Sequence, residues 1–284
     1  FPNYVDAQGQ RMFELRAELE QKQALVHNTW QRAYPFGLGY DTNASQGTSL
    51  SQIDLRLGNG ENLVLAVSPE SREQASIYAQ AIGSVSRTIS SNRMIYASVD
   101  VVDYRNPEVN DLALGSVAVS TDDQMLGAYV FDRSSTRFGA VYRGIFSDWR
   151  IGLQTGSDQH KMSIDRLVAI QHESEGITAE LGVFISEDAS FRWHGFRGQA
   201  NILKDFGQLR YVIEVANADA PFDPVFFPGM KDRYIWQALR FSVPLQSLDT
   251  GRWDLSFDYH QKNHRIEINS WSGFDVKLAW SAPF

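Results

Sequence analysis

Residues 273–284 read GFDVKLAWSAPF, and every second residue back from the C-terminal end is apolar. The residues between the apolar ones are mostly small or charged. This period of two indicates a β-strand with one apolar face and one polar face. Such a strand, ending on an aromatic residue, is typical of the last strand of an outer-membrane β-barrel, with its apolar face in lipid and its polar face in the lumen. The apolar column consists of Phe274, Val276, Leu278, Trp280, Ala282 and Phe284.

The composition of the whole chain agrees with a membrane barrel. The 284 residues are 43% hydrophobic and 21% charged, which excludes a disordered protein. No run of about 18 apolar residues occurs, so we expect no transmembrane helix, whereas barrel strands escape such a search because half of each strand is polar. Aromatic residues make up 12%, which suits the girdles at membrane interfaces. The absence of cysteine excludes disulfides and thiolate metal sites, and the net charge of -8 disfavours a nucleic-acid partner.

From Pro35 onward, short alternating segments are separated by polar turns, and we expect an all-β, transmembrane antiparallel barrel of about 16 strands within residues 33–284. Connections after even-numbered strands are short and rich in Gly, Asn, Asp and Ser, whereas the others are longer. This alternation favours a barrel with both ends in the periplasm over a soluble β-sandwich. The expected strands lie near residues 35–42, 48–57, 61–68, 75–88, 92–103, 111–120, 124–132, 137–146, 148–156, 161–172, 176–186, 191–204, 207–217, 234–246, 251–262 and 271–284.

Residues 1–32 differ in texture from the rest of the chain. Residues 11–25 contain strong helix formers and neither Gly nor Pro, and Met12, Leu15 and Leu19 recur at helical spacing. We expect a short N-terminal amphipathic helix that packs on the barrel or on a preceding helical domain. A solvated lead-in helix is the alternative.

The six histidines offer little catalytic chemistry. The densest cluster is residues 258–265, where His260 and His264 would share one face of a strand but lie well apart. The sequence has no Gly-x-Ser-x-Gly elbow, no His-Glu-x-x-His motif and no phosphate-binding loop. We therefore expect no enzyme, no cofactor and no metal site. A barrel hydrolase, the catalytic alternative, would need a His with a Ser or Asp partner within hydrogen-bonding reach at the rim.

If the apolar faces point to lipid, the opposite faces supply the wall of the lumen, and both signs of charge appear there. Each charged residue can be explained by an ion pair that braces the wall. Together they indicate a wide polar channel that binds no solute tightly. The expected pore-lining residues are Asp54, Arg56, Asp100, Arg150, Glu180, Arg197, Arg210, Glu214, Arg240, Arg252, Asp254, Asp258, Asp275 and Lys277.

The longest expected outer loop, residues 218–233, contains three prolines and Phe222, Phe226 and Phe227. The prolines stiffen the loop, and the phenylalanines are too apolar for a freely solvated loop. We expect these rings to fold inward as a lid that suits the apolar faces of sugars; the alternative is a cap on the barrel rim. The outer loops also lean acidic, which would concentrate a cationic polymer, although solubilising charge is an equal explanation.

The segment Leu38-Gly39-Tyr40-Asp41-Thr42-Asn43 resembles the Gly-Tyr-Asp-Ser-Asn strand that opens several barrels preceded by tetratricopeptide repeats. Residues 11–25 are similar to the last helix of such a repeat region. The chain therefore most resembles the outer-membrane exopolysaccharide export porins, which export Pel polysaccharide, poly-N-acetylglucosamine or cellulose. The same short motif is found in the surface lipoprotein assembly modifiers, which are smaller barrels. The resemblance is architectural over residues 33–284 and rests on one short motif.

This resemblance implies a passive conduit in the bacterial outer membrane for a polysaccharide of the biofilm matrix, with no cofactor. The implied partners are the exported polymer, the surrounding lipid bilayer, a periplasmic helical repeat region and a ring of lipoprotein. An acidic chain best suits a partly deacetylated, cationic polymer. The alternative is a barrel that translocates surface lipoproteins or other proteins, with weak pairing between the first and last strands. Trp280 and Phe284 are the expected assembly signal for the barrel-insertion machinery.

Overall fold

A computed structural model gives the fold of most of the chain. None of the helices among the described residues is long and apolar enough to cross a membrane. The described residues are 30–56, 61–90, 92–133, 136–146, 149–158, 164–174, 176–187, 192–204, 206–221, 229–248 and 251–282. Outside them lie the expected helix at residues 11–25, the expected lid residues Phe222, Phe226 and Phe227, and Phe284.

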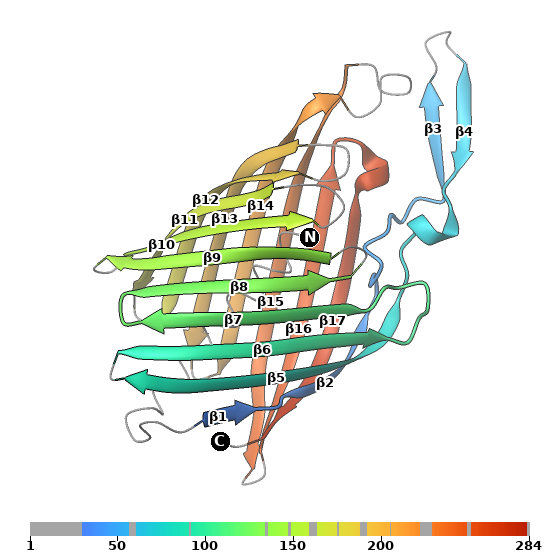
Figure 1. Cartoon of the computed structure of the whole chain (residues 1–284). Coiled ribbons are helices and arrows are strands. Elements are labelled where there is room, and N and C mark those ends of the chain that lie inside the picture. The colour runs from blue at the N-terminus through green and yellow to red at the C-terminus, as the bar shows by residue number, and fades with distance from the viewer. Residues whose placement is uncertain are drawn as a thin grey trace.

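Fourteen of the described strands form a closed antiparallel ring (Figure 1). They are β2 (Phe36–Asp41), β5 (Ser76–Ser90), β6 (Arg93–Tyr104), β7 (Leu112–Thr121), β8 (Gln124–Asp132), β9 (Thr136–Phe146), β10 (Trp149–Asp158), β11 (Ile164–Ser174), β12 (Ile177–Glu187), β13 (Arg192–Lys204), β14 (Gly207–Pro221), β15 (Lys231–Leu248), β16 (Gly251–His264) and β17 (Trp271–Ser281). Each strand pairs with the next strand of the ring, and β2 closes the ring between β5 and β17. A closed ring leaves no open sheet edge.

The expected count of about 16 barrel strands is wrong by one hairpin. The second and third expected strands are β3 (Gln52–Arg56) and β4 (Asn62–Ala66), which pair only with each other and stand apart from the barrel in Figure 1. Their alternating pattern has the same period as a barrel strand, so the sequence does not distinguish the two. Asp54 and Arg56 lie on β3, so the expectation that they line the pore is wrong.

A further strand, β1 (Trp30–Ala33), lies where the end of the helical lead-in was expected. It pairs with residues 84–87 of β5, while β2 pairs with residues 76–81 along the same edge. The break between β1 and β2 falls at Pro35, which has no backbone N–H to donate. The carbonyl of Pro35 still accepts a hydrogen bond from the backbone of β5. β1 therefore extends β2 without adding a strand to the ring.

The connections alternate in length, as the sequence predicted. On one side of the barrel each turn has two residues: 91–92, 122–123, 147–148, 175–176, 205–206 and 249–250. On the other side lie the longer connections 42–75, 105–111, 133–135, 159–163, 188–191, 222–230 and 265–270. We call these ends the turn side and the loop side. In outer-membrane barrels, short turns face the periplasm and longer loops face outward.

The outer face of the ring is apolar. Leu181 and Phe196 are 73% and 70% exposed there, although side chains of this size are normally buried in a soluble domain. Trp149 and Trp253 lie on this face near the turn side, where tryptophans form interfacial girdles. Trp280 lies beside Trp253 in register on the same face. A closed ring with this outer surface and a polar interior is a membrane-spanning barrel, and the protein belongs in the bacterial outer membrane.

Candidate functional site: the inner wall of the barrel

The inner wall of the barrel has two regions with different chemistry. Hydroxyl, amide and charged side chains predominate in the turn-side half, and rings gather in the loop-side half. Met94, Tyr96 and Met125 are exceptions, being buried and inward-facing in the turn-side half. The polar side chains of the turn-side half include Ser84, Ser86, Ser120, Thr178, Asn201, Gln208, Arg210, Ser242, Asp254, Ser256 and Lys277.

A row of five charged residues crosses the inner wall from β14 to β2. Arg210, Arg240, Asp258, Asp275 and Asp41 are successive cross-strand neighbours on β14, β15, β16, β17 and β2. The guanidinium of Arg240 donates to Oδ2 of Asp258 through Nε and Nη2, at 2.6 Å each. The side chains of this pair are 37% and 14% exposed, so the pair is partly open to solvent. The row therefore places two cations beside three carboxylates on adjoining strands.

The closing strand β2 is crossed on its inner face by side chains from its neighbours. Its pairing with β17 covers only six residues. The Tyr78 hydroxyl on β5 donates to the Asp275 carboxylate on β17, with O···O distances of 2.9 and 2.8 Å. A Cβ at Gly39 would lie 2.3 Å from the Tyr78 ring, so only glycine leaves room for this crossing. Farther along, Lys277 on β17 donates to Gln80 on β5 at 3.1 Å. These two bridges hold the seam closed.

Residues 38–43, the segment on which the resemblance to the exporter barrels rests, have structural roles at this seam. Gly39 provides the bare inner face, and the ring of Tyr40 points outward and is 47% exposed. The Asp41 carboxylate accepts a hydrogen bond from the backbone of Asn43 at 2.8 Å. The Asn43 amide in turn donates to the carbonyls of Gly47 and Ser272, which ties the base of the first long connection to β17. The motif therefore closes the barrel and anchors its largest loop.

The other expected pore residues of β6 and β12–β14 are buried in the wall. Asp100, Glu180, Arg197 and Glu214 are all less than 7% exposed. Asp100 accepts two hydrogen bonds from Gln80, at 2.8 and 2.9 Å. Arg197 and Glu214 are direct cross-strand neighbours on β13 and β14. Charged side chains that are this deeply buried need partners. These residues therefore stabilise the barrel wall and also contribute to the electrostatic potential of the lumen.

The remaining expected residues lie near the turn side. Arg252 and Asp254 form an ion pair with each other at 2.8 Å. Arg150 is on β10 opposite Gln171, and only its backbone is described. Trp280 faces lipid beside Trp253.

Aromatic rings form a packed layer in the loop-side half, which we call the aromatic collar. Trp193 on β13 and Tyr234 on β15 meet with ring centroids 5.0 Å apart. Between them, β14 presents Ala216 and Ala218, which are 0% and 2% exposed. Small side chains on the middle strand therefore let rings from both sides lie over it. The collar consists of Phe184, Trp193, Tyr234, Trp236 and, partly buried beside them, Trp271.

A second apolar cluster lines the facing wall on β5–β8, again toward the loop side. Phe131 is fully buried, and the rings of Tyr78 and Tyr104 lie 5.6 Å apart. The Arg133 guanidinium packs over Tyr104 and donates to the carbonyl of Ala44. The base of the first long connection therefore reaches the β8 end of this cluster. The cluster consists of Tyr78, Val102, Leu112, Leu114 and Phe131.

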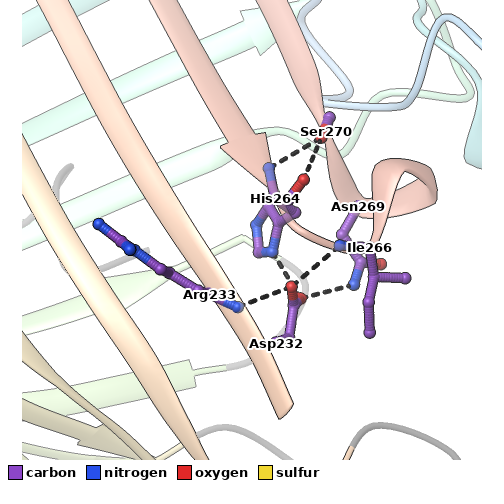
Figure 2. Close-up of polar contacts among 6 residues, drawn as sticks. All are labelled: Asp232, Arg233, His264, Ile266, Asn269 and Ser270. Atoms are coloured by element: carbon purple, nitrogen blue, oxygen red, sulfur yellow. Dashed lines mark hydrogen bonds and ion pairs between the residues drawn. The ribbon is translucent and has the colours of Figure 1, made fainter. Parts of the chain in front are cut away.

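One buried carboxylate, Asp232, organises the loop-side rim between β15 and β17 (Figure 2). Its two oxygens accept hydrogen bonds from the Arg233 and Ile266 backbone N–H groups and from the Asn269 amide, and contact Nδ1 of His264 at 2.7 Å. Asp232 is 1% exposed. The rim thus has a carboxylate strut that fixes the last loop, with its short 3-10 turn η2 (Glu267–Asn269), against β15.

This strut lies beyond the lipid-facing band, because the outer face is already polar at Gln237 and Gln261, which lie between the strut and the outward-facing Leu239 and Tyr259. Burial raises the pKa of Asp232, but hydrogen bonding and charge from His264, with the hydrogen bonds from Asn269 and Ile266, outweigh burial. The pKa of Asp232 is therefore held below its ordinary value of 3.8.

The same rim holds the His–Asp contact that a barrel hydrolase would need. The nearby Ser270 hydroxyl accepts from the backbone N–H of His264 at 2.8 Å and donates to its carbonyl at 3.4 Å. Figure 2 shows that these contacts involve the main chain of His264 and not its ring. A hydrolase needs the hydroxyl on the imidazole, so this site is better described as a structural strut. Within the described ranges, no cluster of three or more His, Asp or Glu could hold a metal ion.

Neither the collar nor the bridges across β2 were expected from the sequence. Period two gives Trp193 the same phase as Arg197 on β13, and gives Tyr234 and Trp236 the same phase as Arg240 on β15. These rings therefore share the face of the expected pore-lining charges. The role of Tyr78 depends on a side chain crossing an entire strand, which no pattern within one segment reveals.

Comparison with known proteins identifies no family for this chain. No protein-family model and no curated protein matches the chain. Among solved structures, a bacterial polysaccharide outer membrane secretin is 11% identical, with a TM-score of 0.48, over 91% of this chain and 99% of that one. A BenF-like porin from Pseudomonas fluorescens Pf-5 is 6% identical, with a TM-score of 0.48, over 91% and 100%. A Pseudomonas aeruginosa FadL homologue is 9% identical, with a TM-score of 0.45, over 89% and 90%. These are outer-membrane barrels, and with TM-scores below 0.5 they carry no conclusion about the function of this chain.

Proposed function

We propose that the protein is an outer-membrane pore that exports a polymeric, cationic polysaccharide of the extracellular matrix. The observation that carries this proposal is the division of the inner wall into a polar turn-side half and a loop-side half of rings. A sugar polymer presents both surfaces that such a wall can meet, because its hydroxyls form hydrogen bonds and its ring faces pack on aromatic side chains. A polymer entering from the turn side would meet hydroxyls and charges first and the collar later.

The inner charges support passage more than tight binding. Arg240 is paired with Asp258, Asp275 with Tyr78, and Arg252 with Asp254. Groups that are already paired offer a polymer exchangeable partners and no single deep site. This arrangement suits a passive conduit.

The preference for a cationic polymer rests on the acidic residues of the loop side. Glu70, Glu73, Glu108 and Asp111 are exposed there. A negative rim raises the local concentration of cations and lowers that of anions, and the effect weakens as salt rises.

Single-channel recording in planar bilayers tests the proposal. Glucosamine oligomers, which are cationic, and N-acetylglucosamine oligomers, which are neutral, are added to the turn side at low and high salt. We expect both to interrupt the ion current, the cationic oligomers at lower concentration, with the difference shrinking at high salt. A steady ion current that neither sugar interrupts would indicate a general diffusion pore instead.

Translocation of lipoproteins or other proteins through an opened seam is the second candidate, favoured by the short six-residue pairing of β2 with β17. The chain has no cysteine, so an engineered disulfide tests it cleanly. Leu38 and Leu278 are registered partners at the seam, and changing both to Cys would lock it. The matched control joins Leu255 to Leu278, which are partners on β16 and β17 away from the seam.

If the lumen is the route, sugar passage is the same in the locked seam, in the control and in the reduced proteins. If the seam is the route, locking it stops transport of a protein client, and reduction restores it.

A further inference from the structure

The outer wall of β5–β8 carries a groove of about 680 Å³ on the face that meets the bilayer. Its floor is the backbone of a registered row across the four strands, and two outward-facing rows form its sides. One side row is Gly83, Val99, Gly115 and Val130, and the other is Val85, Ala97, Val117 and Ala128. The lining of these rows is entirely apolar.

Glycine makes the groove deep at its β5 end. A Cβ built on Gly83 would meet no atom within 4 Å, so the space above this residue is open. Val99, the registered partner of Gly83, and Val117 in the other side row are both more than half exposed. On the opposite wall, the outer faces of the adjacent strands β12 and β13 carry larger residues such as Leu181 and Phe196. The groove is therefore a depression in the apolar outer face.

Cationic side chains lie at the β5 end of the groove and toward the turn side of it, since Arg32 pairs with Val85 in one of the two side rows. Arg32 and Tyr34, both exposed, line the groove itself. Arg87 faces outward on β5, with its guanidinium 5.5 Å from the ring of Trp30. Arg93 is exposed at the start of β6 and shares the outward phase of Ala97 and Val99. Asp122 and Asp123 lie in the turn between β7 and β8.

We propose that this groove binds a phospholipid with an anionic headgroup from the periplasmic leaflet. One acyl chain lies across β5–β8 in the apolar groove, and the headgroup phosphate meets Arg32 and Tyr34, with Arg93 adding positive charge. The occupant is a lipid because this face is embedded in the bilayer, where acyl chains are the abundant flexible apolar groups. Arginines at a membrane interface direct their charge toward headgroups and pair well with phosphate. The inference concerns the outer wall and does not depend on what passes through the lumen.

Native mass spectrometry of the intact barrel, released from nanodiscs, tests the proposal. The nanodiscs contain phosphatidylglycerol mixed with phosphatidylcholine. We expect the wild-type barrel to retain one phosphatidylglycerol in preference to phosphatidylcholine. Arg32→Ala should weaken that preference about fivefold, as expected for the loss of one interfacial cation. Gly83→Leu should abolish retention, because its side chain fills open space without a clash and occupies the path of the acyl chain.

Matched controls come from the opposite wall. Lys204→Ala removes an exposed cation at the turn-side end of β13, and Ala200→Leu enlarges an outward-phase residue on the same strand. Both should leave phosphatidylglycerol retention unchanged. A heat-dependent shift of the folded barrel on gels confirms that every variant has folded.

Three outcomes would overturn the proposal. The first is a wild-type barrel that retains no lipid. The second is retention that is indifferent to both Arg32→Ala and Gly83→Leu. The third is a wild-type dimer that Gly83→Leu converts to a monomer without any bound lipid, because the groove would then hold a second copy of the barrel.

Discussion

In the loop-side half of the inner wall, rings from β12, β13 and β15 pack over alanines and a glycine. In the turn-side half and along the charged row, side chains are held by hydrogen bonds and ion pairs such as Arg240–Asp258. Packing energy is lost when volume is removed, whereas partly exposed charge pairs contribute little stability and mainly set the potential. The two halves should therefore respond to mutation in different ways, the first through stability and pore width and the second through ion selectivity.

The largest effect is expected in the collar. Trp193→Ala removes a ring that packs on Tyr234 and over Ala218, and the loss should be about 3–5 kcal/mol of unfolding free energy. Urea unfolding of the barrel in lipid vesicles measures this loss. Single-channel conductance should rise in the same variant, because an inward-facing ring is removed from the wall of the lumen.

Phe196→Ala on the same strand is the matched control, because Phe196 points outward and is 70% exposed. Its loss of stability should be clearly smaller, and its conductance should equal that of the wild type. Equal stability losses in the two variants would contradict the claim that inner packing holds the loop-side half.

An intermediate effect is expected at Asp232, the charged exception within the loop-side rim. Asp232→Asn should cost about 1–3 kcal/mol at neutral pH, because a buried, hydrogen-bonded carboxylate is replaced by a weaker acceptor. The pKa of Asp232 is held below 3.8, so its stabilising contribution is present above that pH and is lost as the pH falls through the folded-state pKa. The difference in unfolding free energy between wild type and variant should therefore shrink below pH 3.8. A difference that stays constant down to pH 3 would argue against a charged strut.

The smallest effect on stability, and the clearest effect on selectivity, is expected at the Arg240–Asp258 pair. Either Arg240→Gln or Asp258→Asn should change the unfolding free energy by only about 0–1 kcal/mol, since the pair is partly exposed. The reversal potentials of the two variants, measured under a salt gradient, should shift from the wild-type value in opposite directions. Loss of the arginine favours cations, and loss of the aspartate favours anions. Shifts of the same sign would show that this pair does not face the ion path.

Period two and turn chemistry predicted most of the fold. All fourteen strands of the ring fall on expected segments, and the two-residue turns fall on the expected side. β3 and β4 were misassigned because an amphipathic hairpin outside a barrel has the same alternation as a barrel strand. Only pairing partners separate the two cases, and a single sequence does not record them.

The sequence predicted which residues face the lumen but not which of them become neighbours there. Alternation placed Arg240, Asp258 and Asp275 on one face, and the structure shows that strand register brings them side by side. The crossing of Tyr78 over Gly39 depends on ring closure, which joins residues almost 200 positions apart in the chain. The collar forms because a small residue, Ala216, lies on the strand between the two that carry the rings. Which residue lies there is also decided by strand register.

The most direct test of the central claim is thiol modification during single-channel recording, since the natural chain has no cysteine. Ser256→Cys places a thiol on the inner wall of β16, and Leu255→Cys places one on the outer face of the same strand. A charged, membrane-impermeant thiol reagent should lower the current through Ser256→Cys and leave Leu255→Cys unchanged. An absence of current in the unmodified barrel, or equal modification of both variants, would contradict a water-filled pore lined by this inner wall.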